Sequence, residues 1–270
     1  MVNLSVARRS GPGRTRGLVL VGHGVERPAA NEHGITFVGE CPHSPRPAEP
    51  GVRLLLELRR RARPIWLTAS DGTRLYGIEA GVGRTAVVLA HEGGADLCGW
   101  LPYVRTLQAA GLRVLAFDFR GYGSSEVPAT ATLALGRDLA GAVARVRSDG
   151  AADVFLMGAS MGGAAVVQNS SGTRVSGRIS LSGTRLWQGY GVNDPAGVRR
   201  ISAPFLCIGS RDDSRAPATE AQSVLRNIGS ADKRIVLYPG STHGWDLVEQ
   251  PPYGSRTSAL ILKWIRAHSR

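Results

Sequence analysis

Short apolar runs alternate with stretches of helical period from residue 64 onward, and this alternation limits the possible folds more than any other feature of the sequence. The apolar runs are residues 86–90, 114–117, 154–157, 179–181, 205–208 and 235–238, and the helical stretches are residues 101–109, 133–147, 162–168, 219–227 and 255–267. Strands that are apolar along nearly their whole length suit a parallel sheet covered on both faces. Ahead of them, residues 65–69 and 74–79 flank Ser70-Asp71-Gly72, a turn sequence that predicts a hairpin. We therefore expect an α/β fold: a doubly wound, mostly parallel β-sheet with helices on both faces and an N-terminal hairpin.

Residues 1–63 have a different character. They are rich in proline, glycine and arginine and show no sustained period of 2 or 3.6 residues. Residues 1–64 hold eleven arginines and five glutamates, so 11 − 5 = +6 of the net charge of +12 lies there. The remaining charge is spread without a basic helix or a basic patch interleaved with aromatic residues, so we expect no nucleic-acid partner. We predict an irregular, basic and largely disordered extension over residues 1–63 and a folded domain over residues 64–270.

The cellular compartment is predicted from apolar runs and cysteines. No run of about 18 apolar residues is present, and residues 18–21 are too short for the hydrophobic part of a signal peptide. Cys41, Cys98 and Cys207 are few and irregularly spaced, which predicts neither a disulfide framework nor a zinc site, and their odd number fits reduced thiols. We expect a cytoplasmic protein without a membrane partner, a metal or a cofactor. Its oligomeric state is not indicated.

Residues 158–162 form a Gly-Ala-Ser-Met-Gly sequence between an apolar run and an Ala/Val-rich helical stretch. A sharp turn from strand to helix holds the serine in a strained conformation, and only small neighbours two residues before and after it are tolerated. Such a turn directs the Ser160 hydroxyl away from the sheet, at the positive end of the next helix. This context makes Ser160 the candidate nucleophile.

A serine hydroxyl near neutral pH needs a base, and the base needs a carboxylate that fixes its tautomer. His243 follows the last apolar run on a short loop flanked by glycine, at the edge of the sheet where Ser160 is expected. Two adjacent acids, Asp212 and Asp213, follow the run 205–208. We prefer Asp212, three residues after Gly209, and keep Asp213 as the alternative.

Acyl transfer also needs donors for the developing oxyanion. The backbone N–H of Met161, directly after the nucleophile, is the first candidate. The second is expected in the loop after the run 86–90, which reads His91-Glu92-Gly93-Gly94. Gly93 is the candidate there, because the lack of a side chain leaves its N–H accessible.

Taken together, residues 65–270 resemble the α/β-hydrolase superfamily. The matching pieces stand in the family's order: the oxyanion loop at His91, the Asp118–Ser125 turn, the Gly158–Gly162 elbow, the Gly209-x-x-Asp212 turn and His243-Gly244. The resemblance implies hydrolysis of an ester, thioester or amide through an acyl-enzyme, and a structural role for the Asp118–Ser125 turn. One residue departs from the family pattern, because Glu92 stands where glycine usually follows the histidine. A carboxylate near the oxyanion would oppose the developing charge unless it points to solvent or is protonated.

Only about 20 residues separate Gly183 from Ala203, so we expect a lidless member of the family with an open site. Trp187 and Tyr190 are candidates for the apolar walls of its substrate pocket. The predicted function is hydrolysis of a small or medium carboxylic ester or thioester. Two alternatives remain open: a non-catalytic relative that binds a small ligand or a partner, and a peptidase with the same triad.

Overall fold

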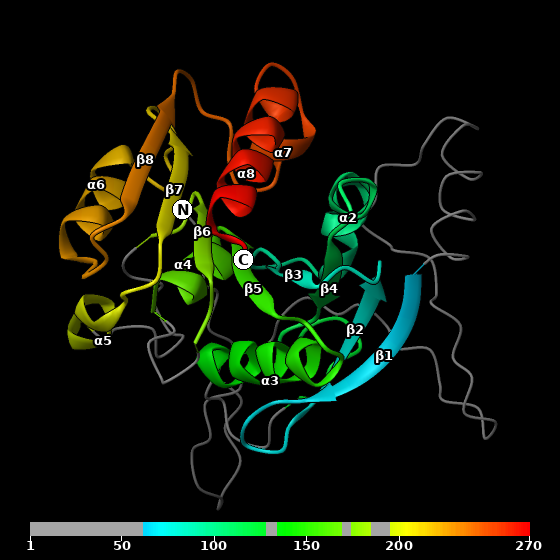
Figure 1. The fold of residues 1–270 in the computed structure, drawn as a ribbon. Coiled ribbons are helices and arrows are strands. Elements are labelled where there is room, and N and C mark those ends of the chain that lie inside the picture. The colour runs from blue at the N-terminus through cyan, green and yellow to red at the C-terminus, as the bar shows by residue number, and fades with distance from the viewer. Residues whose placement is uncertain (1–61, 128–133, 169–173, 185–194) are drawn as a thin grey trace, which may run out of the picture. The chain divides into compact units, whose positions relative to one another are not determined.

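The computed structural model describes residues 62–127, 134–168, 174–184 and 195–270 (Figure 1). Its eight strands form one sheet in the order β1-β2-β4-β3-β5-β6-β7-β8. The strands are β1 (Ala62–Thr68), β2 (Arg74–Ala80), β3 (Thr85–Ala90), β4 (Arg113–Phe117), β5 (Asp153–Ala159), β6 (Gly177–Leu181), β7 (Phe205–Ser210) and β8 (Lys233–Tyr238). The pairs β1–β2 and β2–β4 are antiparallel, and all other pairs are parallel. All eight predicted strands are present, and the predicted mostly parallel sheet with its N-terminal hairpin is confirmed.

Helices cover both faces of the sheet. The described helices are the 3-10 helix η1 (Leu97–Trp100) and the α-helices α2 (Leu101–Ala109), α3 (Leu135–Ser148), α4 (Met161–Gln168), α5 (Pro195–Arg200), α6 (Ala218–Asn227), α7 (Asp246–Glu249) and α8 (Gly254–His268). In β3, Val87 and Leu89 belong to the apolar cluster that includes α2 and α8, whereas Val88 belongs to the cluster with α3 and α4. This alternation is the period of two that a strand covered on both faces requires. The predicted doubly wound arrangement is thus confirmed.

The short helices α5, α7 and η1 were not predicted. They have six, four and four residues, which is too few for an apolar period of 3.6 to be recognised. The five longer helices agree with the predicted ranges to within two residues at each end.

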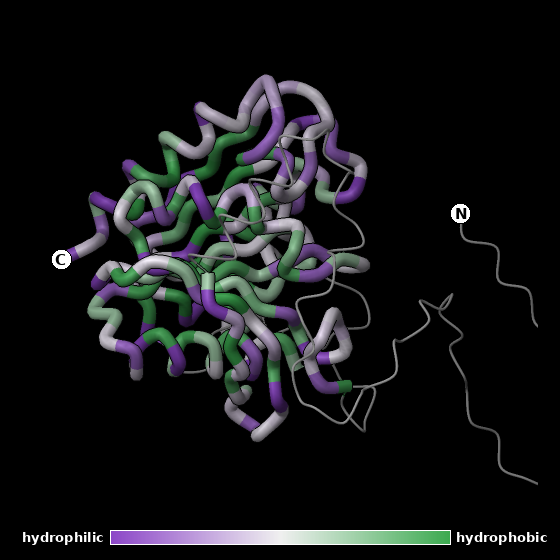
Figure 2. Tube along the Cα trace, turned by 90° about the vertical axis from the view of Figure 1, so that its right-hand side faces the viewer, coloured by the Kyte–Doolittle hydropathy of each residue, from purple (hydrophilic) through white to green (hydrophobic). Residues whose placement is uncertain are grey.

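Hydrophobic segments run through the middle of the fold, as Figure 2 shows, and β5 is buried along its whole length. The longest described helix, α8, has 15 residues. No helix in the described part of the chain therefore combines the length and apolarity needed to cross a bilayer.

The cysteines differ from the prediction of reduced thiols. Cys98, in η1, is disulfide-bonded, whereas Cys207 is free and buried in β7. Cys41 lies outside the described residues. Because disulfides persist mainly in oxidising compartments, the cysteines no longer support the expected cytoplasmic location.

The folded region begins slightly earlier than predicted. Strand β1 starts at Ala62, two residues before the predicted domain boundary, because Ala62 and Arg63 pair with Ala80 and Glu79 of β2. The rest of the predicted extension lies outside the described residues, so its disorder stays a prediction.

Candidate functional site

The turn at Ser160 joins β5 to α4 in the conformation that the sequence predicts. Ser160 has a φ of +50° and is 7% exposed. A side chain on Gly158 would collide with the carbonyl of Gly162, and one on Gly162 would collide with the carbonyl of Ala90. Positive φ is costly for a residue other than glycine and is retained where the surroundings enforce it. The two glycines are therefore what allows the strained serine at this bend.

Asp213, and not the preferred Asp212, lies against His243. The Nδ1–H of His243 donates to Oδ2 of Asp213 over 2.6 Å, and the two residues are 4% and 3% exposed. Asp212 is exposed and accepts a bond of 3.2 Å from the N–H of Gly240. The preference for Asp212 is thus wrong for the partner of His243, and the alternative Asp213 takes this place.

Backbone hydrogen bonds orient the Asp213 carboxylate. Its Oδ1 accepts from the N–H groups of Arg215 and Ala216 over 3.0 and 3.3 Å. This tight turn aims the second oxygen, Oδ2, at the imidazole. The side chain of the preceding residue, Asp212, instead accepts from the N–H of Gly240 in the loop after β8.

The His243 ring has the protonation state that a base requires. Burial lowers its pKa, although the hydrogen bond and the negative charge of Asp213 act in the opposite direction. The ring is therefore neutral near pH 7. Because its Nδ1 proton is donated to Asp213, Nε2 carries the lone pair and can accept a proton.

Consecutive residues at the end of β6 hold Ser160 and the histidine loop at one edge of the sheet. The N–H of Ser160 donates to the carbonyl of Leu181 over 2.9 Å. The hydroxyl of the next residue, Ser182, accepts from the N–H of Gly244 over 3.1 Å. In Figure 1 the supporting strands β5, β6, β7 and β8 lie side by side. The carboxyl ends of these parallel strands thus bring Ser160, Asp213 and His243 to the same edge.

The two predicted oxyanion donors lie in segments that are bonded to each other. The N–H of Gly162 donates to the carbonyl of His91 over 3.1 Å, which ties the turn at Met161 to the loop that carries Gly93. Neither Met161 nor Gly93 donates its N–H to the backbone of another described residue. Their role as oxyanion donors remains a prediction.

His91 fixes the start of this loop. Its Nε2 accepts from the N–H of Phe119 over 3.0 Å, and its Nδ1 bonds to the carbonyl of Glu92 over 2.7 Å. Burial lowers the pKa of His91 to about 4. The ring is thus neutral and engaged on both nitrogens, which makes it a structural residue and not a second base.

The side chain of Glu92 turns toward the histidine loop. Its Oε1 accepts from the N–H of Trp245 over 2.8 Å. The pKa of Glu92 is raised to about 7, mainly by burial. This bond, which joins residues 153 positions apart, could not be foreseen from the sequence.

The turn from Asp118 to Ser125 is bonded to η1, the short helix that follows the loop after β3. Asp118 accepts from the N–H groups of Leu97 and Ser124 over 2.8 and 2.9 Å. A side chain on Gly123 would collide with this carboxylate. The buried Asp118 thereby fixes the position of η1, which follows the oxyanion loop.

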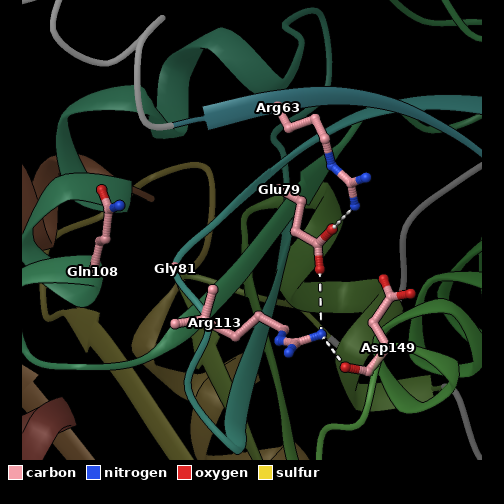
Figure 3. A pocket seen from close by; sticks show the side chains of 7 residues that line it. Arg63, Glu79, Gly81, Gln108, Arg113 and Asp149 are labelled. Carbon is pink, nitrogen blue, oxygen red and sulfur yellow. Dashed lines mark hydrogen bonds and ion pairs between the residues drawn. The ribbon is translucent and has the colours of Figure 1, made fainter.

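The predicted pocket residues Trp187 and Tyr190 lie outside the described residues. A cavity of about 580 Å³ lies at the other edge of the sheet, near the end of β2, the start of β4 and the C-terminal end of α3 (Figure 3). Glu79 pairs there with Arg63 over 2.8 Å and with Arg113 over 3.5 Å. These polar side chains already bind one another, and the cavity is separate from the edge that carries Ser160.

Comparisons with known proteins agree with the fold. Residues 87–194 match the sequence profile of the alpha/beta hydrolase family. The uncharacterized protein YfhR of Escherichia coli (strain K12) is 30% identical over 211 residues, which cover 67% of this chain and 73% of YfhR.

Solved structures of similar fold include two esterases and a lipase. An esterase of Pyrococcus furiosus superposes with a TM-score of 0.68 and 16% identity, covering 79% of this chain and 93% of the esterase. An esterase of Exiguobacterium antarcticum gives 0.63 and 19%, covering 76% and 100%. A monoacylglycerol lipase of Paleococcus ferrophilus gives 0.62 and 20%, covering 72% and 99%. The match of residues 87–194 to the family model and the YfhR match, together with the fold shared with these structures, show that the chain belongs to the α/β-hydrolase family.

Proposed function

We propose that this protein is a serine hydrolase that cleaves a small or medium carboxylic ester or thioester through an acyl-enzyme. Ser160 is the nucleophile, His243 the general base and Asp213 the acid of the triad. The observation that carries the proposal is the 2.6 Å bond between two buried residues, His243 and Asp213, at the sheet edge where Ser160 stands on a strained turn. The names of the similar structures, two esterases and a monoacylglycerol lipase, favour an ester as substrate.

The first half of the reaction forms the acyl-enzyme. Nε2 of His243 takes the proton of the Ser160 hydroxyl while Oγ attacks the carbonyl carbon of the substrate. The carbonyl oxygen becomes an oxyanion and accepts from the N–H groups of Met161 and Gly93. Asp213 stabilises the imidazolium and keeps its tautomer. The imidazolium then returns its proton to the departing alkoxide or thiolate, and the acyl group remains on Ser160.

The second half repeats these steps with water. His243 takes a proton from a water molecule that attacks the acyl carbon, and the same two N–H groups stabilise the second oxyanion. The proton passes to Oγ of Ser160 as the carboxylic acid leaves. In the balance, one ester or thioester and one water are consumed, and one carboxylic acid and one alcohol or thiol are released.

The test is hydrolysis of a series of p-nitrophenyl esters of increasing acyl length. We expect turnover by the wild-type protein, best with short or medium acyl groups, and a loss of at least about 10⁴-fold in Ser160→Ala. Ser148→Ala is the control, because the hydroxyl of this exposed serine at the end of α3 bonds to the carbonyl of Arg145 in its own helix. A wild-type protein that turns over none of the esters would favour a non-catalytic binding protein, and turnover of peptide substrates alone would favour a peptidase.

A further inference from the structure

The loop that carries His243 is held from three directions. Asp213 binds the imidazole, and Ser182 binds the N–H of Gly244. The third contact comes from Glu92, whose Oε1 accepts from the N–H of Trp245 over 2.8 Å. The first two contacts come from the strand ends next to the serine, whereas the third comes from the oxyanion loop after β3.

The histidine loop is shaped to receive the Glu92 carboxyl group. Gly244 has a φ of +58°, and any side chain on it would collide with Oε1 of Glu92. The ring of Trp245 packs on Gly99 and lies edge-on to Trp100, with 5.9 Å between the ring centroids. The carboxyl group therefore lies on the backbone of Gly244, and the tryptophan ring anchors the far side of the loop.

We propose that Glu92 is a positioning residue that sets the His243 imidazole relative to the oxyanion donor Gly93. Glu92 stands between His91, whose ring is fixed by two hydrogen bonds, and Gly93. A single side chain thus joins the loop of the base to the loop of the oxyanion donor. The inference rests on the proposed function, because it assigns Glu92 to the same site.

The surroundings of Glu92 indicate which property of the side chain matters. Asp213 and Arg215 face it from the segment after β7, and Asp246 and Glu249 face it from α7. Three of these four groups are acidic, and burial raises the pKa of Glu92 to about 7. A negative charge is therefore not favoured here, and the function of the side chain is to accept the Trp245 N–H. An amide oxygen can do the same.

Three variants separate the acceptor, the negative charge and the length of the Glu92 side chain. Glu92→Gln keeps the acceptor and the length, Glu92→Ala removes the acceptor, and Glu92→Asp keeps the carboxylate but is one methylene too short to reach Trp245. The matched control is Glu126→Ala, since this exposed carboxylate also accepts a backbone N–H, that of Arg74, over 2.9 Å.

The first measurement is the low-field proton NMR signal of His243 Nδ1–H, assigned by its absence in His243→Ala. We expect the signal to persist in the wild type, Glu92→Gln and Glu126→Ala. In Glu92→Ala and Glu92→Asp we expect it to exchange with water at least about 10-fold faster, because the loop is no longer tied down. The second measurement is ester hydrolysis, where kcat should fall about 10- to 100-fold in Ala and Asp with KM changed less than about 3-fold. Gln should restore kcat to within about 3-fold of the wild type.

The proposal is overturned if Glu92→Ala and Glu92→Asp leave both the proton signal and kcat unchanged, or if Glu92→Gln loses as much as they do. Glu92→Asp keeps the test decisive if the alanine variant does not fold. The NMR signal does not depend on turnover. An inactive wild type would therefore end the proposed function, while the exchange rates still decide whether Glu92 positions His243.

Discussion

Replacing Asp213 by asparagine should remove most of the activity while leaving the fold intact. In the variant, Oδ1 continues to accept from the N–H groups of Arg215 and Ala216, as it does in Asp213. The amide NH₂ then takes the place of Oδ2, 2.6 Å from Nδ1 of His243. Because an NH₂ can only donate, Nδ1 must accept and the ring proton moves to Nε2. A ring protonated on Nε2 cannot take the proton of Ser160.

The expected magnitude follows from this tautomer change. The corresponding Asp→Asn change in a serine protease triad lowers kcat by about 10⁴-fold. Such a loss corresponds to about 5 kcal/mol of transition-state stabilisation. Asp212→Asn is the matched control, because that exposed side chain makes a single 3.2 Å bond to the N–H of Gly240. It should change kcat by less than about 3-fold.

The assay compares kcat and KM of both variants with the best p-nitrophenyl ester at pH 8, with the melting temperature as a check on folding. Equal losses in the two variants, or a larger loss in Asp212→Asn, would refute the assignment of the acid and the tautomer argument behind it.

Three further outcomes follow from the structure. Gly158→Ala should lower the free energy of unfolding by about 3 kcal/mol in urea titration, because its Cβ would collide with the Gly162 carbonyl. In the control Gly209→Ala the Cβ would meet only a leucine methyl at 3.7 Å, so the loss should be less than about 1 kcal/mol. Similar losses in the two variants would contradict the collision. Burial raises the folded-state pKa of Glu249 to about 8 from its ordinary 4.5, so the stability it contributes is present below pH 4.5 and is lost as the pH rises toward 8. In Glu249→Gln the decline in unfolding free energy between pH 5 and pH 9 should be smaller than in the wild type by up to about 4 kcal/mol, and parallel curves would argue against a buried ionisable Glu249. Since burial lowers the pKa of His243, kcat/KM should rise with pH to a plateau with a midpoint below 6.5, and a midpoint above 6.5 would contradict a neutral base.

The sheet could be predicted from the sequence because its signal is local. Each buried strand is a short apolar run, and the turn at Ser160 requires small residues at two recognisable positions, Gly158 and Gly162. The helices that escaped prediction, such as α7 with four residues, are shorter than the pattern that identifies a helix.

The details of the site depend on contacts that the sequence does not encode locally. Asp212 and Asp213 are adjacent, and which of them faces His243 is decided by the turn in which Asp213 accepts the N–H groups of Arg215 and Ala216. Glu92 was expected to oppose the oxyanion unless it pointed to solvent or was protonated, but its side chain bonds to the N–H of Trp245 in a segment far along the chain. Nothing near Glu92 in the sequence indicates that partner. The disulfide bond of Cys98 was missed for the same reason, since spacing along the chain does not show which thiols meet.

The nucleophile can be identified by treating the full-length protein with a fluorophosphonate probe and mapping the labelled peptide by mass spectrometry. We predict a single adduct on Ser160, formed faster as the pH rises through the His243 titration and absent in Ser160→Ala. Labelling at another residue, or a wild-type protein that does not react, would contradict the assignment of Ser160 as an activated nucleophile.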